Sequence, residues 1–259
     1  MRKIFLIGML LILFVVSCKT NQEALKRQAE ASRQLAGAYI NQKKYTLALR
    51  ELLKAEQFYD EDPDLHNDLG FVYMQKNSLD LSVKHFKQAL ELRPDFASAK
   101  NNLGVAYMKK KQWDEAIVCF KELLENLVYT TPQKPMVNLG WVYYNKKEYM
   151  LSAMYYNNAL DLFREGLAKD NDYLMSVYGL SQTYLAEEKS YLAVKILEEG
   201  LKDAPRAYPL YYNLGKAYQI NKDFDKSSRA YQKVVELAPE SDLGEKAKIV
   251  LDTMGALRK

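Results

Sequence analysis

The sequence predicts an all-α protein: a right-handed superhelical solenoid of six helix-turn-helix repeats, closed by a C-terminal capping helix. Rows of recurring residues carry this prediction, and most of their intervals are 34 residues. Leucine recurs at Leu35, Leu69, Leu103, Leu139, Leu180 and Leu214, and a small residue follows each leucine. Tyrosine recurs four residues after each leucine, at Tyr39, Tyr73, Tyr107, Tyr143, Tyr184 and Tyr218.

The same period continues in the second helix of each expected repeat. A small residue recurs at Ala48, Ser82, Ala116, Ser152, Ala193 and Ser227, and a bulky residue four positions later at Leu52, Phe86, Phe120, Tyr156, Leu197 and Tyr231. Small residues let two antiparallel helices approach closely, and bulky residues fill the space between successive hairpins. A leucine, a small residue and a tyrosine at this spacing and period resemble the tetratricopeptide repeat (TPR), which implies a TPR solenoid.

The repeats are expected to occupy most of the chain. We place them at residues 29–62, 63–96, 97–130, 133–166, 174–207 and 208–241, with insertions near Thr131-Pro132 and at 167–173. The last segment, 242–259, has apolar residues on one helical face, at Leu243, Ala247, Val250, Leu251, Met254 and Leu257. This spacing predicts an amphipathic helix that caps the open end of the stack.

Residues 1–17 have the organisation of a secretory signal peptide. Two basic residues precede the apolar run Ile4–Val16, which is shorter than the roughly 20 residues of a membrane-spanning helix. The run ends at Ser17-Cys18, and polar residues follow, which resembles a bacterial lipobox. The resemblance implies acylation of Cys18 and cleavage before it, with residues 18–28 as a lipidated tether. Because Lys19 rather than aspartate follows the cysteine, it also implies the outer membrane. The alternative is an ordinary signal peptide with an incidental cysteine.

The remaining composition gives no sign of catalysis. The net charge is +4 without a block of like charge, so we expect no nucleic-acid partner. His66 and His85 lie in opposite helices of the second repeat, with no cysteine or paired carboxylate at ligand spacing, so we expect surface or packing roles and no metal. Cys119 precedes the expected core residue Phe120 and should be a half-buried free thiol. Since the chain has no HExxH, phosphate-binding loop or nucleophile elbow, we expect neither an enzyme nor a cofactor.

The TPR resemblance implies a concave groove, lined by the first helices of successive hairpins, that holds a protein partner. The expected groove residues are Asn67, Phe71, Met74, Asn101, Asn102, Val105, Met108, Asn138, Trp141, Tyr144, Tyr178 and Tyr212. An apolar groove with adaptable methionines and an aromatic anchor suits a peptide, helix or strand from another protein. The alternative, weighed most evenly for Val105 and Met108, is that these side chains pack between neighbouring first helices.

A lipobox followed by six repeats resembles the type IV pilus pilotins, of the PilW/PilF/Tgl type. The most particular stretch is the junction from Asn126 to Pro132 before Asn138-Leu139-Gly140-Trp141. The resemblance implies an outer-membrane lipoprotein that faces the periplasm and assists insertion and multimerisation of the pilus secretin. The insertion at 167–173 departs from that family. A scaffold for another envelope or cell-wall assembly, with no secretin client, is the alternative.

Overall fold

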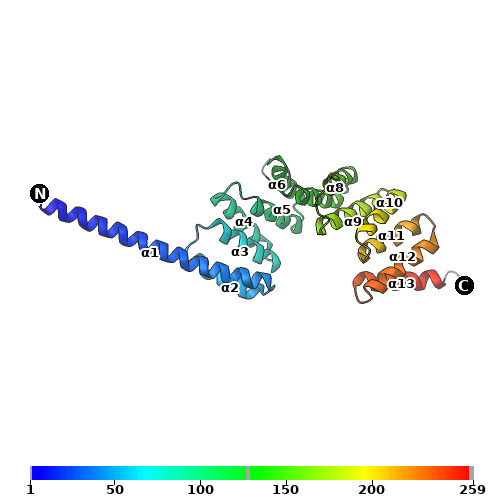
Figure 1. Ribbon diagram of the computed structural model, residues 1–259, viewed down its shortest axis with the longest axis horizontal. Helices are drawn as coiled ribbons and strands as arrows, with labels where there is room; N and C mark the ends of the chain where they lie inside the picture. The colour runs from blue at the N-terminus through cyan, green and yellow to red at the C-terminus, as the bar shows by residue number, and fades with distance from the viewer. Residues whose placement is uncertain (1, 127–128, 257–259) are drawn as a thin grey trace. The chain divides into compact units, whose positions relative to one another are not determined.

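The computed structural model describes residues 2–126 and 129–256, with side chains from residue 22 onward. Within these residues the chain forms thirteen α-helices and no strand (Figure 1). The helices divide between two compact units, Met1–Cys119 (unit 1) and Phe120–Lys259 (unit 2). In each unit, consecutive helices pair as hairpins that stack on one another. The predicted all-α repeat solenoid is therefore confirmed.

Unit 1 contains three first helices and their partners. Its helices are α1 (Arg2–Asn41), α2 (Tyr45–Phe58), α3 (Pro63–Gln75), α4 (Leu79–Leu92), α5 (Ala97–Lys109) and the start of α6 (Trp113–Glu125). Unit 2 continues with α7 (Gln133–Asn145), α8 (Tyr149–Arg164), α9 (Asn171–Ala186), α10 (Ser190–Asp203), α11 (Tyr208–Ile220), α12 (Phe224–Leu237) and α13 (Asp242–Ala256).

The recurring tyrosines mark where each first helix ends. In every repeat the tyrosine carbonyl accepts a hydrogen bond from the backbone N–H five residues later, as between Tyr143 and Glu148 at 2.9 Å. The residue before that N–H is left-handed, at Lys43, Asn77, Lys111, Lys147, Glu188 and Lys222. This is the Schellman arrangement, which satisfies the last carbonyls of a helix and reverses the chain.

Close helix approach explains the small residues of the first helices. A Cβ added at Gly70 would lie 2.6 Å from the Phe86 ring, and one at Gly140 would lie 2.8 Å from the Tyr156 ring. Real Cβ atoms do not approach so closely, so these two hairpins need glycine to seat their bulky residue. The sequence predicted that bulky residues fill the space between successive hairpins; Phe86 and Tyr156 also pack against the glycine of their own hairpin.

The leucine row is buried in every repeat except the first. Leu69 and Leu139 are 0% exposed, whereas Leu35 is 45% exposed. Leu35 therefore departs from the rest of its row. It lies in the first helix of the stack, and among the described residues α1 packs only against α2 and α3, which leaves this side chain uncovered.

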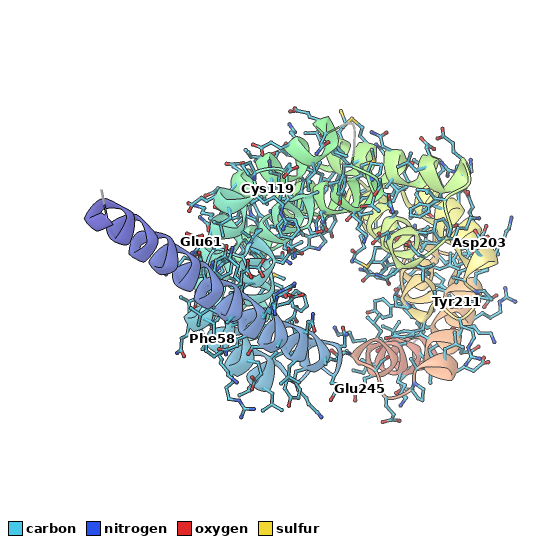
Figure 2. All side chains as sticks on the ribbon, turned by 60° about the vertical axis from the view of Figure 1, so that its left-hand side comes forward. Phe58, Glu61, Cys119, Asp203, Tyr211 and Glu245 are labelled. Carbon is cyan, nitrogen blue, oxygen red and sulfur yellow. The ribbon has the colours of Figure 1, made fainter. Side chains whose placement is uncertain are left out.

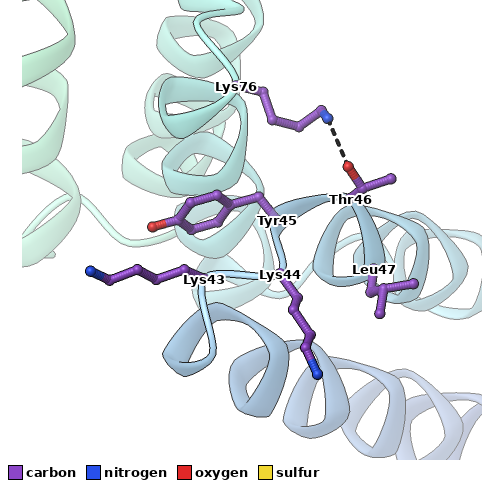
Figure 3. A pocket seen from close by; sticks show the side chains of 6 residues that line it. All are labelled: Lys43, Lys44, Tyr45, Thr46, Leu47 and Lys76. Carbon is purple, nitrogen blue, oxygen red and sulfur yellow. Dashed lines mark hydrogen bonds between the residues drawn. The ribbon is translucent and has the colours of Figure 1, made fainter.

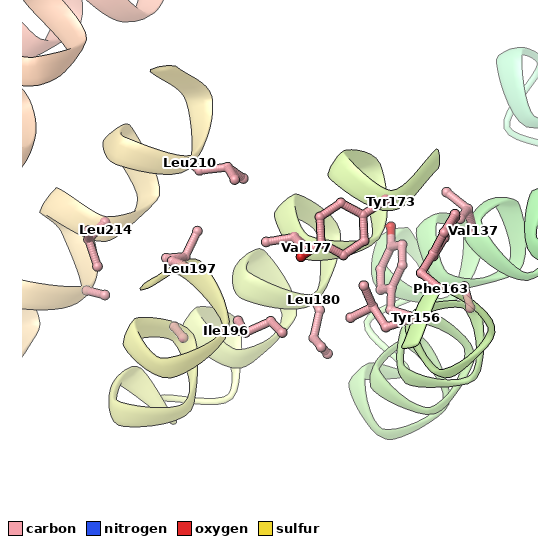
Figure 4. Close-up of a cluster of buried hydrophobic side chains, with 14 of the residues drawn as sticks. Val137, Tyr156, Phe163, Tyr173, Val177, Leu180, Ile196, Leu197, Leu210 and Leu214 are labelled. Carbon is pink, nitrogen blue, oxygen red and sulfur yellow. The ribbon is translucent and has the colours of Figure 1, made fainter. Parts of the chain in front are cut away.

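The core of unit 2 runs through three successive hairpins. Buried residues of α8, α9, α10 and α11 form one continuous apolar cluster, in which Tyr156, Val177, Leu180 and Leu197 are almost fully buried (Figure 4). Because each hairpin buries its face only against its neighbours, the stack rather than any single repeat supplies this core.

The last helix covers the end of unit 2. Ala247 and Met254 of α13 are buried, and Leu243, Val250 and Leu251 pack against the same cluster as Tyr231 of α12. Leu257, also predicted on this face, lies outside the described residues. Among the residues searched for membrane spans, which are those the structure describes, no helix is long and apolar enough to cross a bilayer.

Candidate functional site: the first-helix face

Four predicted groove residues form an aromatic row on the first helices of unit 2. Trp141 and Tyr144 lie one turn apart on α7, Tyr178 lies on α9 and Tyr212 on α11. Residues three apart share a helix face, so the first two point to the same side. α7 packs against α9, and α9 against α11. All four side chains are half-buried, so each has one supported surface and one exposed surface.

The tyrosines of this row are partly buried. Burial raises the pKa of the Tyr178 phenol, and the phenols of Tyr144 and Tyr212 add to the rise. The Tyr178 hydroxyl also accepts a hydrogen bond from Gln182 Nε2 at 3.2 Å. Phenols with raised pKa stay protonated at neutral pH, so each can donate one hydrogen bond and accept others. The row therefore offers apolar ring surface together with uncharged hydrogen-bonding groups.

Rigid packing beneath the row holds its rings in place. Trp141 and Tyr178 pack against the core cluster of unit 2. Tyr212 meets the ring of Tyr231 edge-on, with ring centroids 5.5 Å apart. Tyr144 meets Tyr149 at 5.8 Å. Aromatic side chains fixed in this way lose little conformational entropy when a partner binds, which suits them to an interface.

A buried polar network lies below the same helices. Ser152 of α8 donates to the Gly140 carbonyl at 2.8 Å and lies 2.9 Å from the Thr183 hydroxyl of α9. Since Ser152 uses its one proton on Gly140, Thr183 is the donor when the two hydroxyls bond, with the Gly179 carbonyl at 2.9 Å as its alternative acceptor. The Ser152–Gly140 and Thr183–Ser152 bonds join α7, α8 and α9, the helices that carry Trp141 and Tyr178. Sequence periodicity identified Ser152 as a small residue but gave no sign of this network.

The insertion before α9 is tied to the end of α10. Asp203, labelled in Figure 2, accepts hydrogen bonds from Lys169 Nζ at 2.8 Å and from the Tyr173 phenol at 2.7 Å. These two bonds lower the pKa of the Asp203 carboxyl. Asp170 caps α9 by accepting from the backbone N–H of Asp172 at 2.9 Å. The insertion therefore ends in a defined helix start.

In unit 1 the predicted groove residues are more engaged in packing. Asn102 donates to Asn67 at 3.0 Å, which links α5 to α3. Phe71 contacts the ring of Tyr45 edge-on at 6.4 Å. Met74 is only 6% exposed and presents little surface to a partner.

The remaining groove predictions divide between the two units. Val105 and Met108 of α5 and Asn101 beside them are half-buried, as is Asn138 of α7. A half-buried side chain can either contact a partner or pack between neighbouring first helices. The role of Val105 and Met108 in partner binding therefore stays a prediction. Asn138 lies one turn before Trp141 on α7, and thus at the edge of the aromatic row.

A separate hollow of unit 1 is lined by lysines. Lys43, Lys44 and Lys76 surround about 420 Å³ at the first hairpin turn, and Lys76 Nζ donates to the Thr46 hydroxyl at 3.2 Å (Figure 3). Three ammonium groups on an open rim keep this hollow hydrated. It differs from the aromatic row because three of its six lining residues are lysines, whereas the row has no charged residue.

Of the two cysteines, only Cys119 has a described side chain. The side chain of Cys18, the predicted lipid-attachment residue, lies outside the described residues. Cys119 forms no disulfide with a described residue and is 8% exposed, so it is more buried than the half-buried thiol predicted. The reason is its helical position, since it shares a face with the fully buried Ala116 and Leu123 of α6.

Both histidines are buried in the core of unit 1. His66 is 0% exposed and His85 is 6% exposed, and their Nδ1 atoms are 3.1 Å apart. A third potential ligand, Glu56, lies beside them. Sequence reasoning missed this neighbour because Glu56 belongs to α2 of the preceding hairpin, at no recognisable ligand spacing from His66.

Comparison with known proteins agrees with the repeat assignment. Models of the TPR repeat match residues 72–111, and models of the tetratricopeptide repeat match residues 97–126 and 208–241. A search of curated protein sequences found no match. The matched segments therefore carry TPR repeats in both units.

Solved structures with a similar fold include two pilus proteins. The crystal structure of PilW, a type IV pilus biogenesis factor, has a TM-score of 0.74 at 16% identity, covering 84% of this chain and 97% of PilW. The Pseudomonas aeruginosa PilF structure has a TM-score of 0.69 at 18% identity, covering 87% and 99%. YrrB, a TPR protein with an unusual peptide-binding site, has a TM-score of 0.54 at 20% identity, covering 76% and 97%. At these identities the likeness establishes the fold: this chain is a TPR-repeat protein structurally close to PilW and PilF.

Proposed function

We propose that this protein is a lipid-anchored outer-membrane pilotin, which binds a segment of a type IV pilus secretin and assists its localisation and multimerisation. The observation that carries the binding role is the aromatic row of unit 2. Its half-buried rings, Trp141, Tyr144, Tyr178 and Tyr212, combine apolar surface with uncharged donors and acceptors. Surfaces of this composition favour protein partners, because aromatic anchors supply most of the binding free energy at interfaces.

Two observations support a secretin as the client. The fold is close to that of PilW, which is a type IV pilus biogenesis factor. The lipobox-like sequence around Cys18 would place the row in the periplasm, where secretin subunits arrive. A TPR scaffold for another envelope assembly uses the same surface, so the client must be tested genetically.

The decisive experiment is a deletion strain complemented with variants. We expect the deletion to reduce heat-resistant secretin multimers and surface pili, and the wild-type gene to restore both. Trp141→Ala and Tyr178→Ala are expected to accumulate at normal levels without restoring multimers. Tyr191→Ala is the matched control, because Tyr191 is 68% exposed on the second helix α10, away from the first-helix face.

Two outcomes would contradict the proposal. Normal multimers in the deletion strain would exclude a secretin client and favour the scaffold. Full complementation by both row variants would exclude the aromatic row as the binding surface. Circular dichroism of the purified variants separates loss of binding from loss of folding.

The anchor is tested by Cys18→Ala. We expect this variant to leave the outer-membrane fraction and appear in the soluble periplasm, because lipid chains contribute about 0.8 kcal/mol of membrane affinity per buried methylene. Continued fractionation of the variant with outer membranes would contradict the lipid anchor.

A further inference from the structure

Three potential metal ligands from three different helices meet in unit 1. They are Glu56 of α2, His66 of α3 and His85 of α4, and one ligand atom of each lies within 4.8 Å of the other two. Both imidazoles are buried, and Glu56 is half-buried at the rim of the cluster. The cluster does not include any residue of the aromatic row.

The protonation state of His66 follows from its backbone contact. Its Nε2 lies 2.6 Å from the Asp60 carbonyl oxygen, so Nε2 carries a proton and donates it. In the tautomer with its proton on Nε2, Nδ1 of His66 is the acceptor that faces Nδ1 of His85, 3.1 Å away. A hydrogen bond from the outer nitrogen to a backbone carbonyl is the contact that orients metal-bound histidines in proteins.

Two rings, those of Tyr73 and His66, lie next to His85. The Tyr73 ring lies nearly parallel to it, at 5.3 Å and 13°. The two imidazole planes differ by 19°, and their facing Nδ1 atoms are 3.1 Å apart. Ligand atoms at zinc–nitrogen distances of about 2.0–2.1 Å are separated by about 3.3 Å in a tetrahedral site. The separation of the two nitrogens is therefore close to the one that a zinc ion requires.

We propose that Glu56, His66 and His85 bind a divalent transition-metal ion, with Zn²⁺ as the best match. Two imidazole nitrogens and one carboxylate form a donor set that suits zinc and leaves a fourth position for water. Without the ion, His85 donates its Nδ1 proton to His66. On binding, that proton moves to Nε2 of the same ring, both imidazoles stay neutral, and the rings tilt so that their lone pairs converge on the ion.

The ion would join two successive hairpins. Glu56 belongs to the first hairpin, whereas His66 and His85 belong to the second. A bound ion therefore stabilises the folded form of unit 1, because the ligands are brought together only by folding. This consequence does not depend on the pilotin role.

The test uses the full mature chain without a histidine tag, stripped with a chelator. Isothermal titration with ZnCl₂ is expected to give one site per chain, and Zn²⁺ is expected to raise the thermal unfolding midpoint. The chain has two histidines, both in this cluster, so imidazole NMR signals report on the site alone. We expect both histidines to shift on saturation.

Matched variants assign the ligands. Glu56→Gln replaces a half-buried carboxylate with an amide of the same shape. We expect it to weaken Zn²⁺ binding at least about tenfold. Glu91→Gln makes the same change at an exposed site on α4 and should leave binding unchanged. His85→Gln should abolish binding, with folding checked by circular dichroism.

Either of two results overturns the proposal. Unchanged imidazole signals in excess Zn²⁺ would show that the histidines form only a hydrogen-bonded pair. Wild-type affinity in Glu56→Gln would show that the ion binds elsewhere. Neither result bears on secretin multimers, so failure of the metal site is distinguishable from failure of the pilotin proposal.

Discussion

Gly179 is the position where a single methyl group most directly tests the repeat packing. It lies in α9, and an added Cβ would be 2.2 Å from Cζ and 2.4 Å from the hydroxyl oxygen of Tyr156. Tyr156 cannot swing away easily, because it is only 2% exposed and its ring also lies against Gly140. We therefore predict that Gly179→Ala destabilises unit 2.

The magnitude follows from two opposing effects. Replacing a helical glycine by alanine stabilises a helix by about 1 kcal/mol. Overpacking a well-filled core costs about 1–3 kcal/mol, and the 2.2 Å contact with a fixed ring argues for the upper end. The net expectation is a loss of about 2 kcal/mol in the free energy of unfolding.

Gly37→Ala is the matched control for this substitution. Gly37 lies in helix α1, and its added Cβ meets nothing within 4 Å. Only the helix-propensity gain applies there, so we expect stabilisation by up to about 1 kcal/mol. The same chemical change should thus have opposite signs at the two positions.

The assay is hydrogen exchange read by mass spectrometry, because peptides from each unit report their own free energy of opening. Adding Tyr156→Leu to Gly179→Ala should recover part of the loss, since the two residues share one contact. If Gly179→Ala were neutral or stabilising in unit 2, the packing of Tyr156 against α9 would be refuted.

Three further substitutions test individual features. Ser152→Ala should cost about 1–2 kcal/mol of unfolding free energy, because it removes the buried hydrogen bond to the Gly140 carbonyl. Ser82→Ala should be close to neutral, because that buried hydroxyl makes no hydrogen bond. Equal losses of the two variants in urea titrations would contradict this. Leu139→Ala should cost about 2–5 kcal/mol of unfolding free energy, because Leu139 is fully buried. Leu35→Ala should cost far less, because Leu35 is 45% exposed. Similar losses of the two variants in thermal melts would contradict the exposure of Leu35. Lys147→Gly should stabilise the protein by roughly 1 kcal/mol, because Lys147 has a φ of 62°, which glycine adopts without strain. Lys146→Gly should not stabilise it, because Lys146 has a φ of −74°. A larger gain at Lys146 than at Lys147 would contradict the turn geometry.

Much of the fold was predictable because the residues that recur in each repeat are those that pack between its helices. The leucine and tyrosine rows located every hairpin. The expectation that bulky residues fill the space between successive hairpins is met by Tyr156, which packs against Gly179 of the next repeat. The contacts of Phe86 and Tyr156 with the glycine of their own hairpin were not predicted, because they depend on how the two helices of a hairpin face each other. Leu35 was the exception in its row, because its exposure depends on what packs against α1, which local sequence does not give.

The candidate sites, too, were predictable only in part. Repeat position was enough to bring Trp141, Tyr144, Tyr178 and Tyr212 together as partner-binding candidates. It could not show that burial raises the pKa of the Tyr178 phenol, because burial depends on side-chain orientation. Glu56 approaches His66 and His85 only through stacking of hairpins, so no linear motif marks the cluster.

The central claim is that the aromatic row binds a secretin segment, and site-specific photo-crosslinking in living cells tests it most directly. A photoreactive phenylalanine replaces Tyr178 in one strain and the exposed Tyr191 of α10 in another. The account predicts that the probe at position 178 crosslinks to a secretin peptide identified by mass spectrometry, and that the probe at 191 does not. Secretin crosslinks from position 191 alone, or a different protein captured from position 178, would contradict it.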